Sequence, residues 1–368
     1  SGAGIYINES DFCVITNNYC SDNNYGIHLW DSKDNKITNN TCFYNDGDCI
    51  YLNYSDRNEV INNICSYNGE GIRLSNSSYN EITSNDCSNN NGNGISLEED
   101  SDGNQIANNI CSNNWGSGIS LRSFYGSPEE PDHNQITNNT CSYNYGNGIG
   151  LSDSDRNSIT NNICSYNGGH GISVYCSSSY NEIIDNICSY NDRDGIYLGG
   201  YYIYEPEYNK IINNTFSYNY DHGIYFDYGG RSLIYLNNFI DNADNARSDA
   251  SGAMSSEWDS PVKITYTYKG KTYTNYMGNY WSDYTGSDKN GDGIGDTSYE
   301  IAWLEEYDYY PLMEPWENYF PENKPPIASF THTPENPVVD QTITFDASSS
   351  YDPDGTIVSY DWDFDDGN

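Results

Sequence analysis

Hydrophobic residues occur along most of this chain in short pulses of one or two residues, separated by longer polar stretches. In residues 80–97, NEITSNDCSNNNGNGISL, the apolar positions are Ile82, Cys87, Ile95 and Leu97. Each lies between polar residues, and such alternation is typical of strands rather than helices. Asparagine and glycine, which favour tight corners, separate the pulses. The pattern therefore predicts three short strands and three corners in each stretch of about 22 residues.

This unit repeats with a nearly constant period. The stretch NNICSYNG occurs at residues 62–69 and again at 161–168, and Phe216 and Phe239 take the cysteine position in two later repeats. The aligned cysteines, at intervals of 22, 23, 22, 24, 30, 23 and 24 residues, are Cys20, Cys42, Cys65, Cys87, Cys111, Cys141, Cys164 and Cys188. A three-stranded unit repeated in this way predicts a parallel β-helix of about ten coils of 22–24 residues, with coils stacked about 4.8 Å apart.

Stacking the coils in register places identical residues in rows. One corner row, whose stacked side-chain amides are expected to bond to one another, comprises Asn35, Asn58, Asn80, Asn104, Asn134, Asn157, Asn181 and Asn209. Cys13 replaces this asparagine in the first coil, and Cys49 replaces the glycine of the recurring G-I-x-L in the second. We interpret the cysteine row as an inward stack of small apolar side chains; a thiol array for metal or redox chemistry and disulfides between coils are the alternatives.

Composition excludes several partners. The chain has 368 residues, 36% of them hydrophobic, and a net charge of -39 from 54 acidic and 15 basic residues. Nucleic acids and anionic membrane surfaces both require clusters of Lys and Arg, so neither is an expected partner. No apolar run approaches the length of a transmembrane helix.

The repeat resembles the NosD-like or CASH group of right-handed parallel β-helices, found in archaeal cell-surface proteins and in sugar-active enzymes. The segments MGNYWSDYTGSDKNGDGIGDTSYEI (residues 277–301) and DYYPLMEPW (residues 308–316) are similar to the C-terminal part of archaeal NosD-like surface proteins. The resemblance implies copper delivery for some members. Because three Met and five His are scattered along this chain, we do not expect a copper site here.

A second resemblance follows the linker PENKPP (residues 321–326). DPDG (residues 352–355) and YDWDFDDG (residues 360–367) are similar to the first half of a polycystic-kidney-disease (PKD) repeat, an immunoglobulin-like β-sandwich. The expected all-β organisation is a parallel β-helix at 1–242, a C-terminal cap at 243–320, and a linker with partial PKD-like sandwich at 321–368.

The cap contains a predicted metal site. In DKNGDGIGD, oxygen-bearing side chains alternate at Asp288, Asn290 and Asp292, and Asp296 follows. The spacing matches the start of an EF-hand-like calcium loop, although the usual twelfth-position Glu is missing. We predict structural calcium; a turn that binds no metal is the alternative.

Two coils carry insertions at one corner, residues 122–133 and 199–208, three coil steps or about 14 Å apart. Aromatic rings beside carboxylates suit a polysaccharide site, since rings stack on sugars and paired acids perform glycosidic chemistry. The candidate catalytic residues are Glu129, Glu130, Asp132, Glu205 and Glu207, and the candidate ligand-binding residues of the second loop are Tyr201 and Tyr202. Solvent-facing loops without catalytic function are the alternative.

Tyrosines form a further predicted row, which either stiffens a corner or contacts a glycan or another molecule. Its members are Tyr44, Tyr67, Tyr143, Tyr166, Tyr190 and Tyr218. A second set points outward from G-I-x-L: Tyr6, Tyr51, Tyr197 and Tyr225. Candidate N-glycosylation sites at one corner are Asn8, Asn53 and Asn76.

The function predicted from these features is structural or adhesive: an extracellular cell-surface protein, a component of a surface layer, sheath or filament. The expected partners are other copies of the chain, other surface-layer proteins and polysaccharide. The rival is a carbohydrate-active enzyme, a polysaccharide lyase or glycoside hydrolase that uses the groove between the inserted loops. An acid pair, or an acid near Arg or Lys, held on strands would favour the enzyme. Because we find none in the sequence, the balance favours a non-enzymatic role.

Overall fold

The computed structural model describes residues 2–123, 129–200, 204–248, 255–301, 306–321, 325–353 and 356–363. The chain forms two compact units, Ser1–Trp316 and Glu317–Asn368. Among the described residues, regular structure is almost entirely β, with one short 3-10 helix, η1 (Trp316–Tyr319). No described helix has the length and apolar character needed to cross a membrane.

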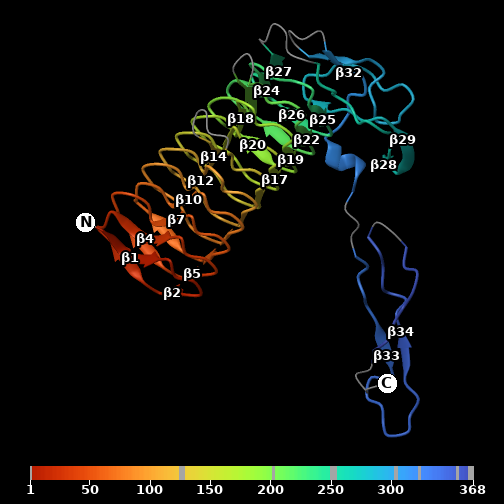
Figure 1. Cartoon of the computed structure of the whole chain (residues 1–368). Helices are drawn as coiled ribbons and strands as arrows, with labels where there is room; N and C mark the ends of the chain where they lie inside the picture. Colours follow the sequence, from red (N-terminus) through yellow and green to blue (C-terminus); the bar gives the residue numbers. More distant parts are fainter. Residues whose placement is uncertain are drawn as a thin grey trace. The chain divides into compact units, whose positions relative to one another are not determined.

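The first unit is a parallel β-helix of about ten turns, which confirms the predicted fold class (Figure 1). The coils contribute strands to two long parallel sheets, A and B, and either a strand or a single-residue bridge to a third, sheet C.

Sheet A consists of β1 (Ala3–Asn8), β4 (Tyr25–Trp30), β7 (Ile50–Asn53), β10 (Ile72–Ser75), β12 (Ile95–Glu98), β14 (Ile119–Arg122), β16 (Ile149–Ser152), β18 (Ile172–Tyr175), β21 (Ile196–Gly199), β24 (His222–Phe226) and β27 (Asp244–Ser248). Sheet B consists of β2 (Val14–Thr16), β5 (Lys36–Thr38), β8 (Glu59–Ile61), β11 (Glu81–Thr83), β13 (Gln105–Ala107), β15 (Gln135–Thr137), β17 (Ser158–Thr160), β19 (Glu182–Ile184), β22 (Lys210–Ile212) and β25 (Leu233–Tyr235). Sheet C consists of β3 (Tyr19–Ser21), β6 (Thr41–Phe43) and β9 (Ile64–Ser66), then β20 (Ile187–Ser189), β23 (Thr215–Ser217), β26 (Asn238–Ile240) and β30 (Tyr280–Trp281). Single-residue parallel bridges continue sheet C between its two groups of strands.

The interior is a narrow column of Ile, Leu, Val and Cys side chains, almost all fully buried. The aligned cysteines lie inside this column, as the small-apolar interpretation requires. Glycine begins G-I-x-L because the coils approach closely there: a Cβ on Gly71 would lie 2.3 Å from the carbonyl oxygen of Gly94. Cys49, which occupies this position in the second coil, forms a disulfide with Cys65, and the other nine cysteines are free.

Stacked asparagines satisfy the polar groups at the corners. In the predicted row, Asn58 donates from its side chain to the Oδ1 of Asn80 at 3.1 Å, and its backbone amide donates to the same oxygen at 2.8 Å. Both contacts repeat along most of the row, as expected. Asn134 and Asn181 keep only the backbone-amide bond to the next Oδ1, and the buried side-chain NH2 of Asn134 has no partner. Two further asparagine rows follow the same pattern; Asn139 belongs to one and Asn144 to the other.

The C-terminal end of the β-helix is covered by aromatic rings. Trp281 stacks on Phe239 at 4.3 Å between centroids and on Tyr299 at 4.2 Å. The buried Asp308 accepts from the indole of Trp281 at 2.8 Å, which ties this layer to the last strands. The strands of this region are β28 (Ile264–Tyr268), β29 (Lys271–Asn275), β31 (Tyr299–Ile301) and β32 (Glu306–Asp308).

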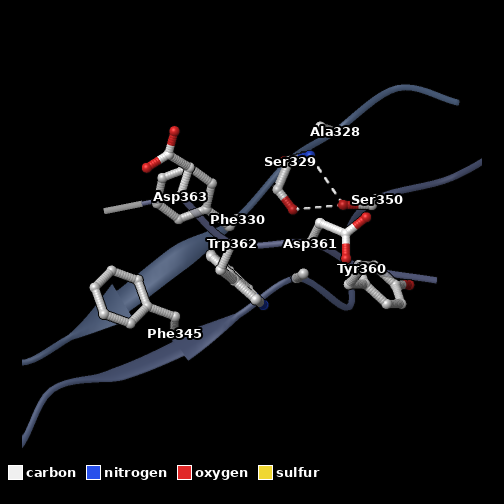
Figure 2. A pocket seen from close by; sticks show the side chains of 10 residues that line it. Ala328, Ser329, Phe330, Phe345, Ser350, Tyr360, Asp361, Trp362 and Asp363 are labelled. Atoms are coloured by element: carbon white, nitrogen blue, oxygen red, sulfur yellow. Dashed lines mark hydrogen bonds between the residues drawn. The ribbon is translucent and has the colours of Figure 1, made fainter. Parts of the chain in front are cut away.

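In the described part of the second unit, β33 (Thr331–Thr333) and β34 (Thr344–Asp346) form an antiparallel pair. Phe330, Phe345 and Trp362 form a cluster with ring centroids 5.4–6.2 Å apart beside a hollow of about 260 Å³ (Figure 2). The hollow is lined mainly by aromatic and small residues, an arrangement typical of an apolar sheet face rather than of a catalytic site.

Candidate active site

The outer face of sheet A carries its side chains in vertical columns. The x of G-I-x-L forms the first column, in which each residue pairs with the next: Tyr6, His28, Tyr51, Arg73, Ser96, Ser120, Gly150, Ser173, Tyr197, Tyr225 and Arg247. The residue before G-I-x-L forms the second: Tyr25, Asp48, Glu70, Asn93, Ser117, Asn147, His170, Asp194 and His222.

Small side chains occupy the middle of this face. From Ser96 to Ser173 the first column contains only Ser and Gly, and the neighbouring Ser117 and Asn147 are also short. A shallow hollow of about 350 Å³ lies over this part of the sheet. We call it the sheet A trough, and it ends at the coil that carries His170 and Ser173.

Two histidines share one buried carboxylate where the trough ends. The Nδ1 of His170 lies 2.9 Å from Oδ2 of Asp194, and the Nδ1 of His222 lies 2.6 Å from Oδ1. The Asp194 side chain is only 4% exposed. Burial by itself would raise the pKa of this carboxyl, but the hydrogen bonds from both histidines outweigh burial and hold its pKa below the ordinary value.

An ionised carboxylate only accepts hydrogen bonds, so the Nδ1 of each histidine carries the proton. The backbone amide of Asp194 also lies 3.4 Å from Nδ1 of His170, but the carboxylate contact at 2.9 Å is the shorter one and decides the assignment. This leaves Nε2 of each ring as the atom able to take up a proton, as in other sites where a carboxylate fixes the histidine tautomer.

Tyrosines from sheet A pack against both imidazoles. Tyr197 stacks on His170 at 4.6 Å between centroids, and Tyr225 stacks on His222 at 4.8 Å. The Tyr197 hydroxyl donates to Oδ2 of Asp227 at 3.0 Å. Burial raises the pKa of Tyr197, and the neighbouring Asp227 raises it further, so this hydroxyl keeps its proton at neutral pH.

These groups line a hollow of about 310 Å³ that also receives Arg193, Asp221 and Arg247. Two guanidinium groups on one small surface are notable in a chain with only 15 basic residues. Guanidinium groups suit carboxylate recognition because their donors match the two oxygens of a carboxylate. The hollow therefore combines a proton acceptor, a protonated hydroxyl and cations, the parts needed to remove a proton next to a carboxylate.

A second charged cluster lies nearer the N-terminus on the same face. The fully buried Glu98 on β12 accepts from the Nε of Arg73 on β10 at 2.9 Å and from the Nε of Arg122 on β14 at 3.0 Å. Burial, with the nearby Glu70, raises the pKa of Asp48 to about 7. Glu98 is paired with both arginines, whereas Oδ2 of Asp48 and Oε2 of Glu70 are buried without a hydrogen-bond partner. We assign the Glu98 ion pairs to the scaffold.

The inserted corner carries the acids predicted from the sequence. Oδ1 of Asp132 accepts from the backbone amide of Asp155 at 2.7 Å, and Glu207 accepts from Arg231 at 3.1 Å, so both contribute to the corner's own bonding. Burial, with Asp132, Asp155 and Asp153, raises the pKa of Glu130 to about 7. Glu129 is exposed and Glu205 half-buried. Catalysis by these five acids stays a prediction; Tyr201 and Tyr202 lie outside the described residues.

The other predicted sites have definite positions. Tyr143, Tyr166, Tyr190 and Tyr218 stack in sequence with centroids 4.9–5.0 Å apart, and Tyr44 stacks on Tyr67 at 5.4 Å. Among the glycosylation candidates, Asn8 is exposed, Asn76 half-buried and Asn53 buried. Contacts with partners through the tyrosines, and glycosylation, stay predictions.

The predicted calcium loop folds around its own backbone. Asp288 accepts from the amides of Gly291 and Gly293 at 2.7 and 2.8 Å, and Asp296 accepts from the amide of Lys289 at 3.0 Å. Asn290 donates to Asp292 at 3.1 Å. Across the described parts of the chain, no group of three or more His, Cys, Asp or Glu side chains could hold a metal ion. Calcium binding stays a prediction.

The sequence interpretation identified Tyr197 and Tyr225 as outward-facing but missed His170, Asp194 and His222. These three occupy the same position in successive repeats, 24 and 28 residues apart. Alignment of the residue before each G-I-x-L would have shown three ionisable side chains stacked one above another.

Comparison with known families agrees with this architecture. The family model described as periplasmic copper-binding protein (NosD) matches residues 1–127 and 123–286. The chain belongs to the NosD family. A PKD-domain model matches residues 323–368 of this NosD-family chain. The family description therefore places its reference member in the periplasm, outside the cytoplasm.

Solved structures of similar fold act on polysaccharides. The A-module of the Azotobacter vinelandii mannuronan C-5 epimerase AlgE6 has a TM-score of 0.56 and 14% identity over 66% of this chain and 72% of that chain. The A-module of AlgE4 from the same organism has a TM-score of 0.56 and 16% identity over 69% of this chain and 76% of that chain. At these identities the likeness shows the fold alone.

The balance drawn from the sequence in favour of a non-enzymatic role is wrong on two grounds. Its structural neighbours are carbohydrate-active enzymes, so the fold is consistent with an enzyme. The expectation also rested on finding no acid near Arg or Lys on strands, and Glu98 between Arg73 and Arg122 has that arrangement.

Copper does not fit the described residues. Seven of the nine free cysteines, the soft ligands that copper(I) favours, lie within the apolar core, and the part-buried Cys13 and Cys176 belong to no group of metal-ligating side chains among the described residues. We therefore derive no chemistry from copper for this NosD-family chain.

Proposed function

We propose that this protein acts on an acidic polysaccharide by removing the proton from the carbon next to a uronate carboxylate. The observation that supports this most is the pair of histidines held by one buried Asp194, with tyrosine hydroxyls and arginines around the same hollow. The proposal includes two outcomes of one first step: epimerisation or β-elimination.

In the proposed first step, Nε2 of His170 takes the proton from C5 of the uronate. We choose His170 because it lies in the coil where the sheet A trough ends. Arg193 or Arg247 pairs with the substrate carboxylate, where negative charge accumulates as the C–H bond breaks. A proton returned to C5 by water from the opposite face gives the epimer. If the C4–O bond breaks instead, its electrons leave with the oxygen, which takes up a proton from water, and a C4–C5 double bond forms. In both outcomes His170 releases the proton that it took to water.

The sheet A trough supports a polymer rather than a small acid as substrate. It spans the coils from Ser96 to Ser173, three steps of about 4.8 Å along a row of small side chains. An extended glycan placed along this row would bring its end to His170. We also propose that the protein is exported and acts on its polysaccharide outside the cytoplasm, at the cell surface.

The test is incubation with alginate, polygalacturonate and hyaluronan in deuterated buffer. Deuterium at C5 without cleavage indicates epimerisation, and ultraviolet absorption of a new unsaturated uronate indicates elimination. We expect His170→Gln to lose either signal by about 10²–10⁴-fold, the usual contribution of a general base. His133→Asn is the matched control, because it is an exposed histidine whose left-handed backbone (φ 58°) asparagine tolerates.

Three results would contradict the proposal. The first is neither exchange nor cleavage on any uronan. The second is release of reducing ends without unsaturation, which indicates hydrolysis. The third is full activity in His170→Gln.

A further inference from the structure

The tyrosine row is interrupted, and the interruption leaves one ring face open. In the coils between Tyr67 and Tyr143 the row position is held by Asn89 and Asn113, as the coil-to-coil backbone bonds show. Among the described residues only Tyr166 stacks on Tyr143, so the opposite face of the Tyr143 ring looks toward Asn113.

Two more aromatic side chains stand beside this open face. Trp115 and Tyr145, two residues after Asn113 and Tyr143, have ring centroids 6.0 Å apart. Trp115 is 71% exposed and Tyr145 is 77% exposed, so two large apolar rings face solvent side by side. Together with asparagines and Gly168 these rings line an open hollow of about 380 Å³, within the range of small-ligand sites.

The chemistry of the hollow selects one class of ligand. Its lining consists of aromatic, asparagine and glycine residues, so the hollow itself is uncharged although the chain carries a net charge of -39. Aromatic faces pack against the C–H faces of sugars, and amide side chains exchange hydrogen bonds with hydroxyl groups. A cationic protein partner would find no acid here, and an anionic one would meet the repulsion of the whole chain.

We propose that this hollow, the Trp115 hollow, binds a neutral pyranose unit of a polysaccharide. The ring stacks on the open face of Tyr143 between Trp115 and the Asn113 amide. The site lies on the corner between sheets C and A. It shares no lining residue with the hollow around His170, Asp194 and His222, called here the His170 hollow, although Gly168 is only two residues from His170. The proposal does not depend on the chemistry proposed at the His170 hollow.

The test is native gel electrophoresis of the full chain in gels that contain laminarin, hydroxyethylcellulose or dextran, with alginate as the acidic comparison. We expect a neutral glucan to slow the protein, and Trp115→Ala to weaken its apparent affinity about tenfold or more. Tyr220→Ala is the matched control, since Tyr220 holds the same repeat position and is also 77% exposed.

A second variant fills the site instead of emptying it. Asn113→Tyr places a tyrosine at a row position whose φ of 58° matches the 60° of Tyr143, so the coil accepts it. The new ring covers the open face of Tyr143, and binding is lost while the circular dichroism and melting temperature stay near those of the parent chain.

Several outcomes would overturn the proposal. These are no retardation by any neutral glucan, retardation by alginate only, or equal retardation of Asn113→Tyr, Trp115→Ala and the parent. Light scattering that shows a dimer dissolved by Trp115→Ala would identify the face as a contact between copies instead. Asp194→Asn is expected to retain glucan binding, so failure here and failure at the His170 hollow are distinguishable.

Discussion

Asp194→Asn should inactivate His170 but not His222, because it replaces the hydrogen-bond acceptor that faces His170 with a donor. The Oδ1 of Asp194 accepts from the backbone amide of His222 at 3.0 Å as well as from its Nδ1 at 2.6 Å. In Asp194→Asn the side-chain oxygen therefore stays toward His222, and the new NH2 group faces His170. An NH2 group cannot accept the Nδ1 proton of His170, so that proton moves to Nε2, the atom that must serve as base.

The expected magnitude follows from the size of a general base contribution. If His170 takes the substrate proton, its loss reduces turnover by about 10²–10⁴-fold. His222 keeps its tautomer because its acceptor is unchanged, so the variant separates the two histidines without removing either ring. Asp192→Asn, in the same coil and exposed, is a control with the same change in charge.

Nitrogen-15 labelling of the histidines provides a readout that does not require a known substrate. The chain has five histidines, few enough to assign by substitution. In the parent protein we expect the Nδ1–H form at His170 and His222; in Asp194→Asn only His170 should change to Nε2–H. Retention of Nδ1–H at His170, or a change at His222 instead, would refute the reasoning whatever happens to activity.

Three further predictions concern stability. Burial raises the folded-state pKa of Asp48 from 3.8 to about 7, so between pH 4 and 7 the folded chain holds a proton that the unfolded chain has released. The free energy of unfolding should therefore fall with rising pH in this range, by up to about 1.4 kcal/mol per pH unit. Denaturant titrations at several pH values should show that the free energy of unfolding of Asp48→Asn falls less steeply with pH than that of the parent. Gly71→Ala should cost about 1–3 kcal/mol, because its Cβ meets a carbonyl oxygen at 2.3 Å, whereas Gly150→Ala, with its nearest neighbour at 3.5 Å, should change stability by less than about 1 kcal/mol. Asn139→Ala should cost about 2–5 kcal/mol, since it leaves the carbonyl of Ile106 and an amide of the preceding coil without partners; a melting temperature equal to that of the parent would contradict the asparagine-row argument.

The scaffold could be predicted from sequence because every coil repeats the same physical requirements. Ile82, Cys87 and Leu97 each fill a layer of a core only one side chain wide, and Asn80 bonds to the coils on both sides. A polar residue at the first three positions, or an apolar one at the last, would leave a buried group unpaired. The sequence pattern therefore predicts both where the strands lie and how they pair in register.

The disulfide could also have been derived from that register. In other coils, a Cβ added to the G-I-x-L glycine would contact the cysteine of the following coil. A Cβ on Gly71, for example, would lie 2.9 Å from the Cβ of Cys87. Cys49 puts a real Cβ and sulfur at this position, and the cysteine of the following coil is Cys65.

The candidate site could not be predicted in the same way, because the outer face of sheet A imposes no common requirement. The residue before G-I-x-L is Tyr, Asp, Glu, Asn, Ser or His in different coils, and only comparison along the column shows that His170, Asp194 and His222 are stacked. The inserted loops attracted attention because they break the repeat, yet insertions mark where a coil can tolerate extra residues. Chemistry on a β-helix can instead be assembled one substitution per coil: the scaffold fixes the spacing near 4.8 Å, which suits a carboxylate between two imidazoles. The absence of any break in the repeat at Asp194 is therefore compatible with an active site there, and outward columns deserve the same scrutiny as loops in proteins of this fold.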